Sequence, residues 1–141
     1  MAELHDRITK FFNAIIAENI EEIKNGYVQD ERTYVVLEGP RYSTKGYSMI
    51  AKGWGDFTTS PIAMTKIVWT EGPFEEIIGD MGWISGITEL YLNVNGKEVF
   101  NTFRSSFVFK REDNDWKIRH EHVSAPHPDP YGVGDWLKKD K

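Results

Sequence analysis

The sequence predicts an α+β fold, with helices in its first part and an antiparallel sheet in the rest. An apolar stripe at helical spacing runs through residues 4–16, and long stretches rich in β-branched and aromatic residues follow Pro61. Asn95-Gly96, between two of these stretches, is the strongest short-range signal for a β-hairpin. Because helical and strand patterns are segregated along the chain, we expect helices packed on a mostly antiparallel sheet.

The composition is that of one globular domain. The chain has 141 residues, with 17 basic and 22 acidic side chains, and the net charge of −5 disfavours nucleic acid and anionic membranes as partners. It contains no cysteine, which excludes disulfides and thiolate metal ligands. The charged first residues do not resemble a signal peptide, and no stretch approaches the ~20 apolar residues of a membrane span. We therefore expect a cytoplasmic protein.

Three helices are expected in the first part of the chain. The apolar positions of the first recur on one face: Leu4, Ile8, Phe11, Phe12, Ile15 and Ile16. A short second helix is expected at 20–25, capped by Asn19 and ended by Gly26. The third has helical spacing at Tyr47, Ile50, Ala51, Trp54 and Phe57, with Ser43 or Thr44 as its cap.

Strands occupy the remaining stretches. A short strand is expected at 32–37, before Gly39-Pro40. The later ones are expected at 62–71, 74–79 (an irregular edge piece), 81–94, 98–110 and 116–124. The two-residue turn at Asn95-Gly96 places Thr88 opposite Phe103 and Gly86 opposite Ser105.

The last strand alternates strictly between two kinds of residue. Trp116, Ile118, His120, His122 and Ser124 share one face, while Lys117, Arg119 and Glu121 share the other. The first face begins as a core face and then becomes polar, so we expect it to enter a cavity. A single β-bulge would invert part of this assignment.

His120 and His122 are therefore the leading candidates for a functional site. An imidazole has a pKa that is easily tuned near neutrality, and His120 is the best candidate for a general base or a hydrogen-bond donor to a ligand. The alternative is that both rings are satisfied by buried partners and only stabilise the end of the sheet. No third ligand is well placed, so neither a metal nor another cofactor is expected.

Further candidates for contacts with a ligand are aromatic residues and one hydroxyl: Tyr27, Trp54, Phe57, Phe103, Ser105 and Phe107. For Tyr27 and Trp54 the alternative interpretation is a purely structural place in the core.

The order of elements and the closing motif resemble a known superfamily. Helices followed by a bent sheet that ends in Trp-x-x-x-His-x-His-x-Ser-x-Pro, over residues 116–126, resemble the nuclear transport factor 2-like superfamily. More narrowly, the chain resembles its SnoaL-like group and the association domain of calcium/calmodulin-dependent protein kinase II. The resemblance implies one cone-shaped domain over residues 1–126, with a pocket at one end. It also implies a homodimer through the outer face of the sheet.

The resemblance also limits the chemistry to be expected. Where the kinase domain uses an arginine for a carboxylate, this chain has Phe107, and Arg104 is expected on the outer face. The helix tyrosine of steroid isomerases is replaced by Phe11 or Phe12, and no strand aspartate is placed to complete their trio. A small-molecule-binding pocket protein remains, with possible isomerase, cyclase or hydrolase chemistry by proton transfer on a largely apolar substrate. The alternative is a non-catalytic ligand-binding or oligomerisation domain.

The last residues, 127–141, form a proline-rich tail that contains Tyr131, Trp136 and Leu137. Because the tail is this apolar, we expect it to pack on its own domain or on a neighbouring subunit.

Overall fold

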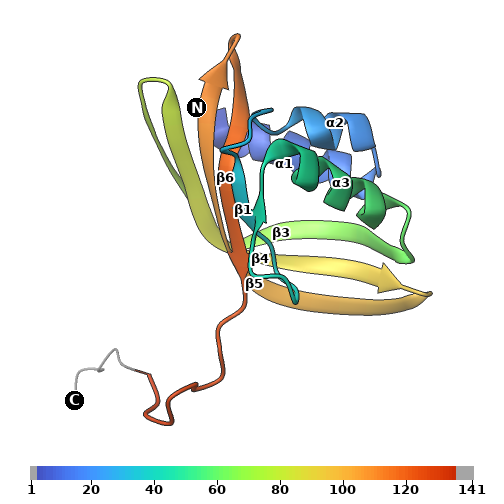
Figure 1. Cartoon of the computed structure of the whole chain (residues 1–141). Coiled ribbons are helices and arrows are strands. Elements are labelled where there is room, and N and C mark those ends of the chain that lie inside the picture. The colour runs from blue at the N-terminus through green and yellow to red at the C-terminus, as the bar shows by residue number, and fades with distance from the viewer. Residues whose placement is uncertain (1–2, 136–141) are drawn as a thin grey trace.

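The computed structural model describes residues 3–135 and has three helices on one side of a curved six-stranded sheet (Figure 1). The helices are α1 (Glu3–Ile16), α2 (Ile20–Asn25) and α3 (Tyr47–Thr58). The strands are β1 (Tyr34–Val36), β2 (Thr44–Lys45), β3 (Ile62–Ile78), β4 (Met81–Val94), β5 (Lys97–Glu112) and β6 (Asp115–Ser124). The sheet order is β2-β1-β6-β5-β4-β3, and β1 runs parallel to β6 while the other neighbours are antiparallel. The predicted α+β class is confirmed.

The two ends of α2 follow the sequence prediction. The Asn19 side chain accepts a hydrogen bond from the Glu22 N–H at 3.2 Å, and Gly26 ends the helix. The start of α3 differs, because Gly46 precedes it with φ +91° and Thr44 belongs to β2. The expected cap from Ser43 or Thr44 is therefore wrong. The chain leaves β2 through a left-handed conformation that favours glycine.

β3 is longer than expected because it continues through the Gly72–Pro73 dipeptide. The stretches 62–71 and 74–79, expected as separate pieces, belong to one strand that shifts register against β4 on either side of Glu71. Opposite this point the Cβ of any side chain at Gly86 would clash with the Glu71 carbonyl oxygen. Gly86 thus permits the close approach of β3 and β4 where the register shifts.

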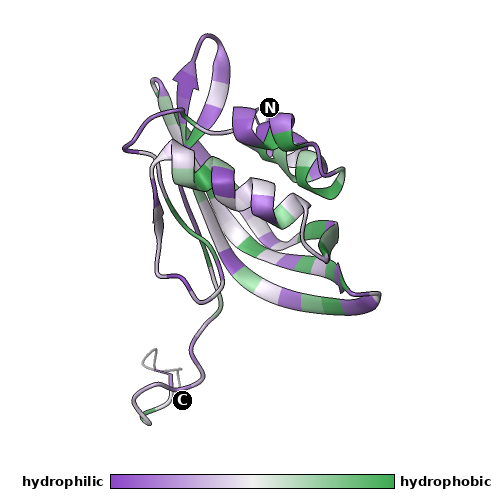
Figure 2. Ribbon diagram, turned by 45° about the vertical axis from the view of Figure 1, so that its right-hand side comes forward, coloured by the Kyte–Doolittle hydropathy of each residue, from purple (hydrophilic) through white to green (hydrophobic). Residues whose placement is uncertain are grey.

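The β4–β5 hairpin has the predicted register. Thr88 pairs with Phe103 and Gly86 with Ser105. The core lies between this hairpin and α1, whose apolar positions recur along the helix (Figure 2). Of the apolar stripe predicted for α1, every residue but Ile16 is buried, and Ile16 is half-buried. The buried residues of α1 are Leu4, Ile8, Phe11, Phe12, Ala14 and Ile15.

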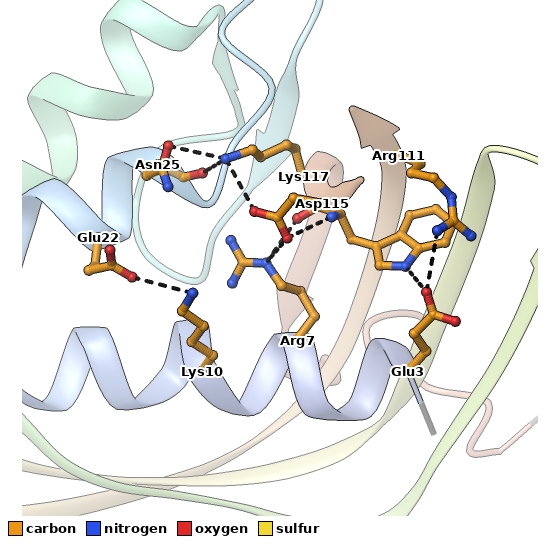
Figure 3. A network of polar contacts seen from close by, with 9 residues as sticks. Glu3, Arg7, Lys10, Glu22, Asn25, Arg111, Asp115 and Lys117 are labelled. Atoms are coloured by element: carbon orange, nitrogen blue, oxygen red, sulfur yellow. Dashed lines mark hydrogen bonds and ion pairs between the residues drawn. The ribbon is translucent and has the colours of Figure 1, made fainter. Parts of the chain in front are cut away.

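Polar contacts fix α1 against β6 (Figure 3). The Arg7 Nε–H donates to the Trp116 carbonyl oxygen at 2.9 Å and lies 3.4 Å from the Asp115 carboxylate. The Trp116 indole N–H donates to the Glu3 carboxylate at 2.6 Å. From β3, at the opposite edge of the sheet from β1 and β2, the Glu75 carboxylate accepts the backbone N–H groups at the start of α1, those of residues 4 and 5, both at 3.0 Å. Glu75 therefore caps a helix that begins about 70 residues earlier.

A β-bulge in β6 changes which residues face the interior. Phe109 pairs with Ile118 and Val108 pairs with His120, so Arg119 is an extra residue without a partner on β5. Beyond it the alternation is shifted by one.

The faces predicted for β6 are consequently correct before the bulge and wrong after it. Trp116 and Ile118 are buried as expected. Glu121 is also buried, at 3% exposure, whereas His120 and His122 lie on the outer face.

The chain leaves the sheet after β6, and its residues 125–135 are exposed (Figure 1). Tyr131 is 71% exposed, while Trp136 and Leu137 lie outside the described residues. Packing of this tail on its own domain or a neighbour stays a prediction. Among the helices of residues 3–135, none is long and apolar enough to cross a membrane.

Candidate active site

A cavity of about 510 Å³ lies between the helices and the inner face of the sheet. Most of its wall is apolar, and the aliphatic and aromatic side chains come from α1, α3, strands β1 and β3–β6, and the residue that follows β1. They are Phe11, Phe12, Ile15, Val35, Leu37, Met49, Ile50, Trp54, Phe57, Ile62, Met64, Ile67, Leu90, Leu92, Phe103, Phe107 and Val123. Exposed polar residues form part of the lining, namely Glu38, Arg41, Asp56 and Asn101. Both the size and this lining are typical of sites for small organic molecules.

Three polar side chains in the lining are deeply buried. Thr88 is 1% exposed, Ser105 is 2% exposed and Glu121 is 3% exposed. They come from β4, β5 and β6. Polar groups in such a wall orient a ligand or take part in its chemistry.

Glu121 belongs to a chain of hydrogen bonds that begins in α3. The Trp54 indole N–H donates to the Tyr27 hydroxyl oxygen at 2.8 Å. The Tyr27 O–H in turn donates to Oε1 of Glu121 at 2.6 Å. An indole N–H can only donate, which fixes the direction of the whole chain toward the carboxylate. Phe11 packs edge-on against both aromatic partners, with ring centroids 5.5 Å from Tyr27 and 6.2 Å from Trp54.

Burial raises the pKa of Glu121 from 4.5 to about 7, and the hydrogen bond from Tyr27 opposes this rise. Burial and the neighbouring carboxylate raise the pKa of Tyr27 well above 10, so the phenol keeps its proton. Glu121 thus exchanges between its acid and its carboxylate near neutral pH. A carboxyl group in this state can both remove and return a proton.

Thr88 and Ser105 form a second polar group in the cavity wall. Their hydroxyl oxygens lie 2.8 Å apart, and each hydroxyl has its hydrogen bond with the other. They meet because Thr88 is the diagonal cross-strand neighbour of Ser105, two residues beyond its direct partner Gly86.

Most of the predicted ligand contacts line this cavity. Trp54, Phe57, Phe103, Ser105 and Phe107 all belong to its wall, and their contact with a ligand stays a prediction. Trp54 also belongs to the core, so the two interpretations of this residue are compatible. Tyr27 lies behind the wall, where it holds Glu121 rather than facing the cavity.

The two histidines do not reach the cavity, so their predicted inward orientation is wrong. The His120 Nδ1 lies 2.8 Å from the Tyr34 carbonyl oxygen, and its ring stacks on that of Tyr34 at 5.9 Å. His122 is exposed and pairs with Ser106 across the outer face. Within residues 3–135, no three His, Cys, Asp or Glu side chains come together as candidate metal ligands.

The strict alternation of the sequence predicts Glu121 on the solvent side. The bulge at Arg119 reverses that assignment, and no glycine or proline marks the position. Glu121, which the sequence pattern did not predict for the cavity, is therefore the direct neighbour of both predicted histidines, His120 and His122.

Solved structures with the same arrangement place the fold among the nuclear transport factor 2-like proteins. A superfamily protein from Salmonella enterica is 21% identical, covers 94% of this chain and 95% of its own, and has a TM-score of 0.79. A proposed calcium/calmodulin-dependent protein kinase II association domain from Xanthomonas campestris is 20% identical (88% and 86% covered, TM-score 0.76). A ketosteroid isomerase-like protein from Erwinia carotovora atroseptica is 12% identical (89% and 96% covered, TM-score 0.72). Identities this low establish the fold alone.

The sequence pattern of the SnoaL-like domain matches residues 4–128, and the chain belongs to this family. Among proteins whose descriptions are curated, none matches the sequence.

Proposed function

We propose that this protein is a small-molecule enzyme that transfers a proton on a largely apolar substrate, with Glu121 as the acid–base group. The observation that carries the proposal is a carboxyl group with a pKa of about 7 in the wall of a mostly apolar cavity. A carboxyl group is costly to bury without a compensating role. The isomerase-like description of one structural neighbour is consistent with such chemistry.

The proposed step uses one carboxylate oxygen of Glu121 as a base. It removes a proton from a substrate C–H, and the electron pair that remains moves into the substrate. The protonated Glu121 then returns the proton at another carbon, which gives an isomer without any co-reactant. Tyr27 donates to Oε1 throughout, and the apolar wall keeps bulk water from competing.

Ligand binding without chemistry is the alternative. It is favoured by the satisfied pair of Tyr27 and Glu121, since their 2.6 Å hydrogen bond would stabilise the interior without any substrate.

Solvent-proton exchange tests the proposal without knowledge of the natural substrate. The protein is incubated in D₂O with a panel of apolar C–H acids, such as cyclic ketones and unsaturated lactones, and loss of C–H signals is followed by ¹H NMR. We expect exchange with at least one compound, and a decrease by about 10²- to 10⁴-fold in Glu121→Gln.

His120→Gln is the matched control on the same strand, and its exchange rate should stay within twofold of the wild type. Exchange that survives in Glu121→Gln would overturn the proposal. Compounds that shift protein resonances without any exchange would support the ligand-binding alternative.

We also propose that the outer face of the sheet forms a homodimer. Exposed apolar side chains gather there on β3 and β4, with Phe74 at 56%, Ile78 at 74% and Trp83 at 42% exposure. Light scattering should give about twice the 16.3 kDa of one chain, and Trp83→Asp should lower this mass. A single-chain mass for the wild type at micromolar concentration would refute the dimer.

A further inference from the structure

The hydroxyl pair of Thr88 and Ser105 has a hydrogen that nothing in the described chain accepts. Each hydroxyl carries one hydrogen, and only one of the two is used in the bond between the oxygens, 2.8 Å apart. No other hydrogen bond of either side chain occurs within residues 3–135. One donor per pair is therefore left over, whichever hydroxyl donates to the other.

The position of the pair directs this donor to the cavity. Both residues line it, and both are at most 2% exposed. Buried donors without an acceptor are rarer in proteins than buried acceptors without a donor, because their desolvation is not compensated. An acceptor atom from a bound molecule would complete this pair.

The sheet register also fixes where this donor lies relative to Glu121. Phe107 pairs with Glu121, and Ser105 pairs with Val123, so Ser105 and Glu121 are diagonal neighbours on the inner face. The Cα atoms of such diagonal neighbours are separated by about 7 Å. This is the length of a small ring system, and the surrounding wall is apolar.

We propose that Thr88 and Ser105 form a subsite for a carbonyl oxygen of the ligand, so that the natural ligand is an uncharged, largely apolar carbonyl compound. This inference deepens the proposed function, since it assigns the substrate class of the same cavity. The carbonyl oxygen accepts the leftover hydroxyl hydrogen, and the apolar body extends toward Glu121. The hydroxyl pair is thereby the specificity-determining element of the site.

A matched pair of probes tests this subsite. 1-Tetralone and tetralin share one bicyclic skeleton and differ in a single carbonyl group, and their dissociation constants are measured by NMR titration of ¹⁵N-labelled protein. We expect the wild type to bind 1-tetralone about fivefold to tenfold more tightly than tetralin, as one hydrogen bond would give. The double variant Thr88→Val/Ser105→Ala should lose this preference and still bind tetralin.

Two control variants separate this inference from the proposed function. Thr102→Val removes an exposed hydroxyl on the same strand, and it should keep the preference for 1-tetralone. Glu121→Gln should keep it too, even though proton exchange is lost.

Equal affinity of the wild type for the two probes, or a preference that persists in the double variant, would mean that the pair binds only water. Either result overturns the subsite and leaves the role of Glu121 unaffected. A preference lost in Glu121→Gln but kept in the double variant would assign carbonyl recognition to Glu121 instead.

Discussion

Glu121 and His122 are adjacent in β6 and lie in opposite environments. Glu121 is 3% exposed, pairs with Phe107 on the inner face and accepts the Tyr27 hydrogen bond. His122 is exposed on the outer face beside Ser106. The extra residue at Arg119 assigns them this way round. A single β-bulge thus decides which side chains of β6 face the cavity.

The largest difference expected between the inner and outer residues of β6 is in how the free energy of unfolding depends on pH. The pKa of Glu121 is raised to about 7 in the folded chain, so the folded chain binds this proton more tightly than the unfolded chain does. Stability is therefore lost as the pH rises from 4.5 to 7, by an amount on the order of 3 kcal/mol. Glu121→Gln should remove this loss, as urea unfolding at pH 4.5 and pH 8 would measure.

Glu98→Gln is the control for this titration, because it removes an exposed carboxylate from the neighbouring strand. It should leave the loss of stability unchanged. If the difference in the free energy of unfolding between the wild type and Glu121→Gln is the same at both pH values, the carboxyl group is not buried.

The next largest effect is expected from loss of the Tyr27 hydroxyl, which donates a hydrogen bond to Glu121. Tyr27→Phe removes the donor to Glu121 and the acceptor of the Trp54 N–H, so we expect a loss of about 2 kcal/mol in the free energy of unfolding. The pKa of Glu121 should also rise further, as ¹³C NMR of the carboxyl group would detect. The matched control is Tyr91→Phe, which breaks a tyrosine–glutamate hydrogen bond at a partly exposed site. A smaller loss for Tyr27→Phe than for this control would contradict the assigned burial.

Deletion of Arg119 tests the bulge itself. Without this residue the pairs Phe109–Ile118 and Val108–His120 become consecutive, and Glu121 still faces the cavity. We expect the loss of stability to be about 1 kcal/mol, since the contacts of Arg119 with Asp30 and Thr33 are long, at 3.9 and 3.5 Å. The raised pKa of Glu121 should persist, and a value near 4.5 would show that the strand had changed register.

The smallest effect is expected on the outer side. His122→Ala should change the free energy of unfolding by no more than about 0.5 kcal/mol, because the side chain is exposed. Proton exchange should also be unchanged. Lost exchange in this variant, with stability intact, would restore the histidine to the candidate site.

Sequence patterns predicted the parts of the fold that local chemistry determines. The Asn95-Gly96 turn fixes the β4–β5 register, and with it the meeting of Thr88 and Ser105. Asn19 and Gly26 determine the limits of α2 in the same way.

The errors lie where tertiary pairing overrides a local pattern. β6 alternates strictly in sequence, but its bulge is fixed by the strands on either side, β5 and the parallel β1. The extension of β3 through Gly72–Pro73 likewise depends on its partner β4. The inner residues before the bulge were therefore predictable, and Glu121 was not.

The capping of α1 by Glu75 has a consequence for how a nascent chain folds. α1 is synthesised before the strands that hold it, since its N-terminal cap lies 70 residues later and its Trp116 contact lies 113 residues after Glu3. A free helix of 14 residues is marginal in water. The amphipathic segment that covers the cavity therefore lacks these stabilising contacts until β6 has been synthesised.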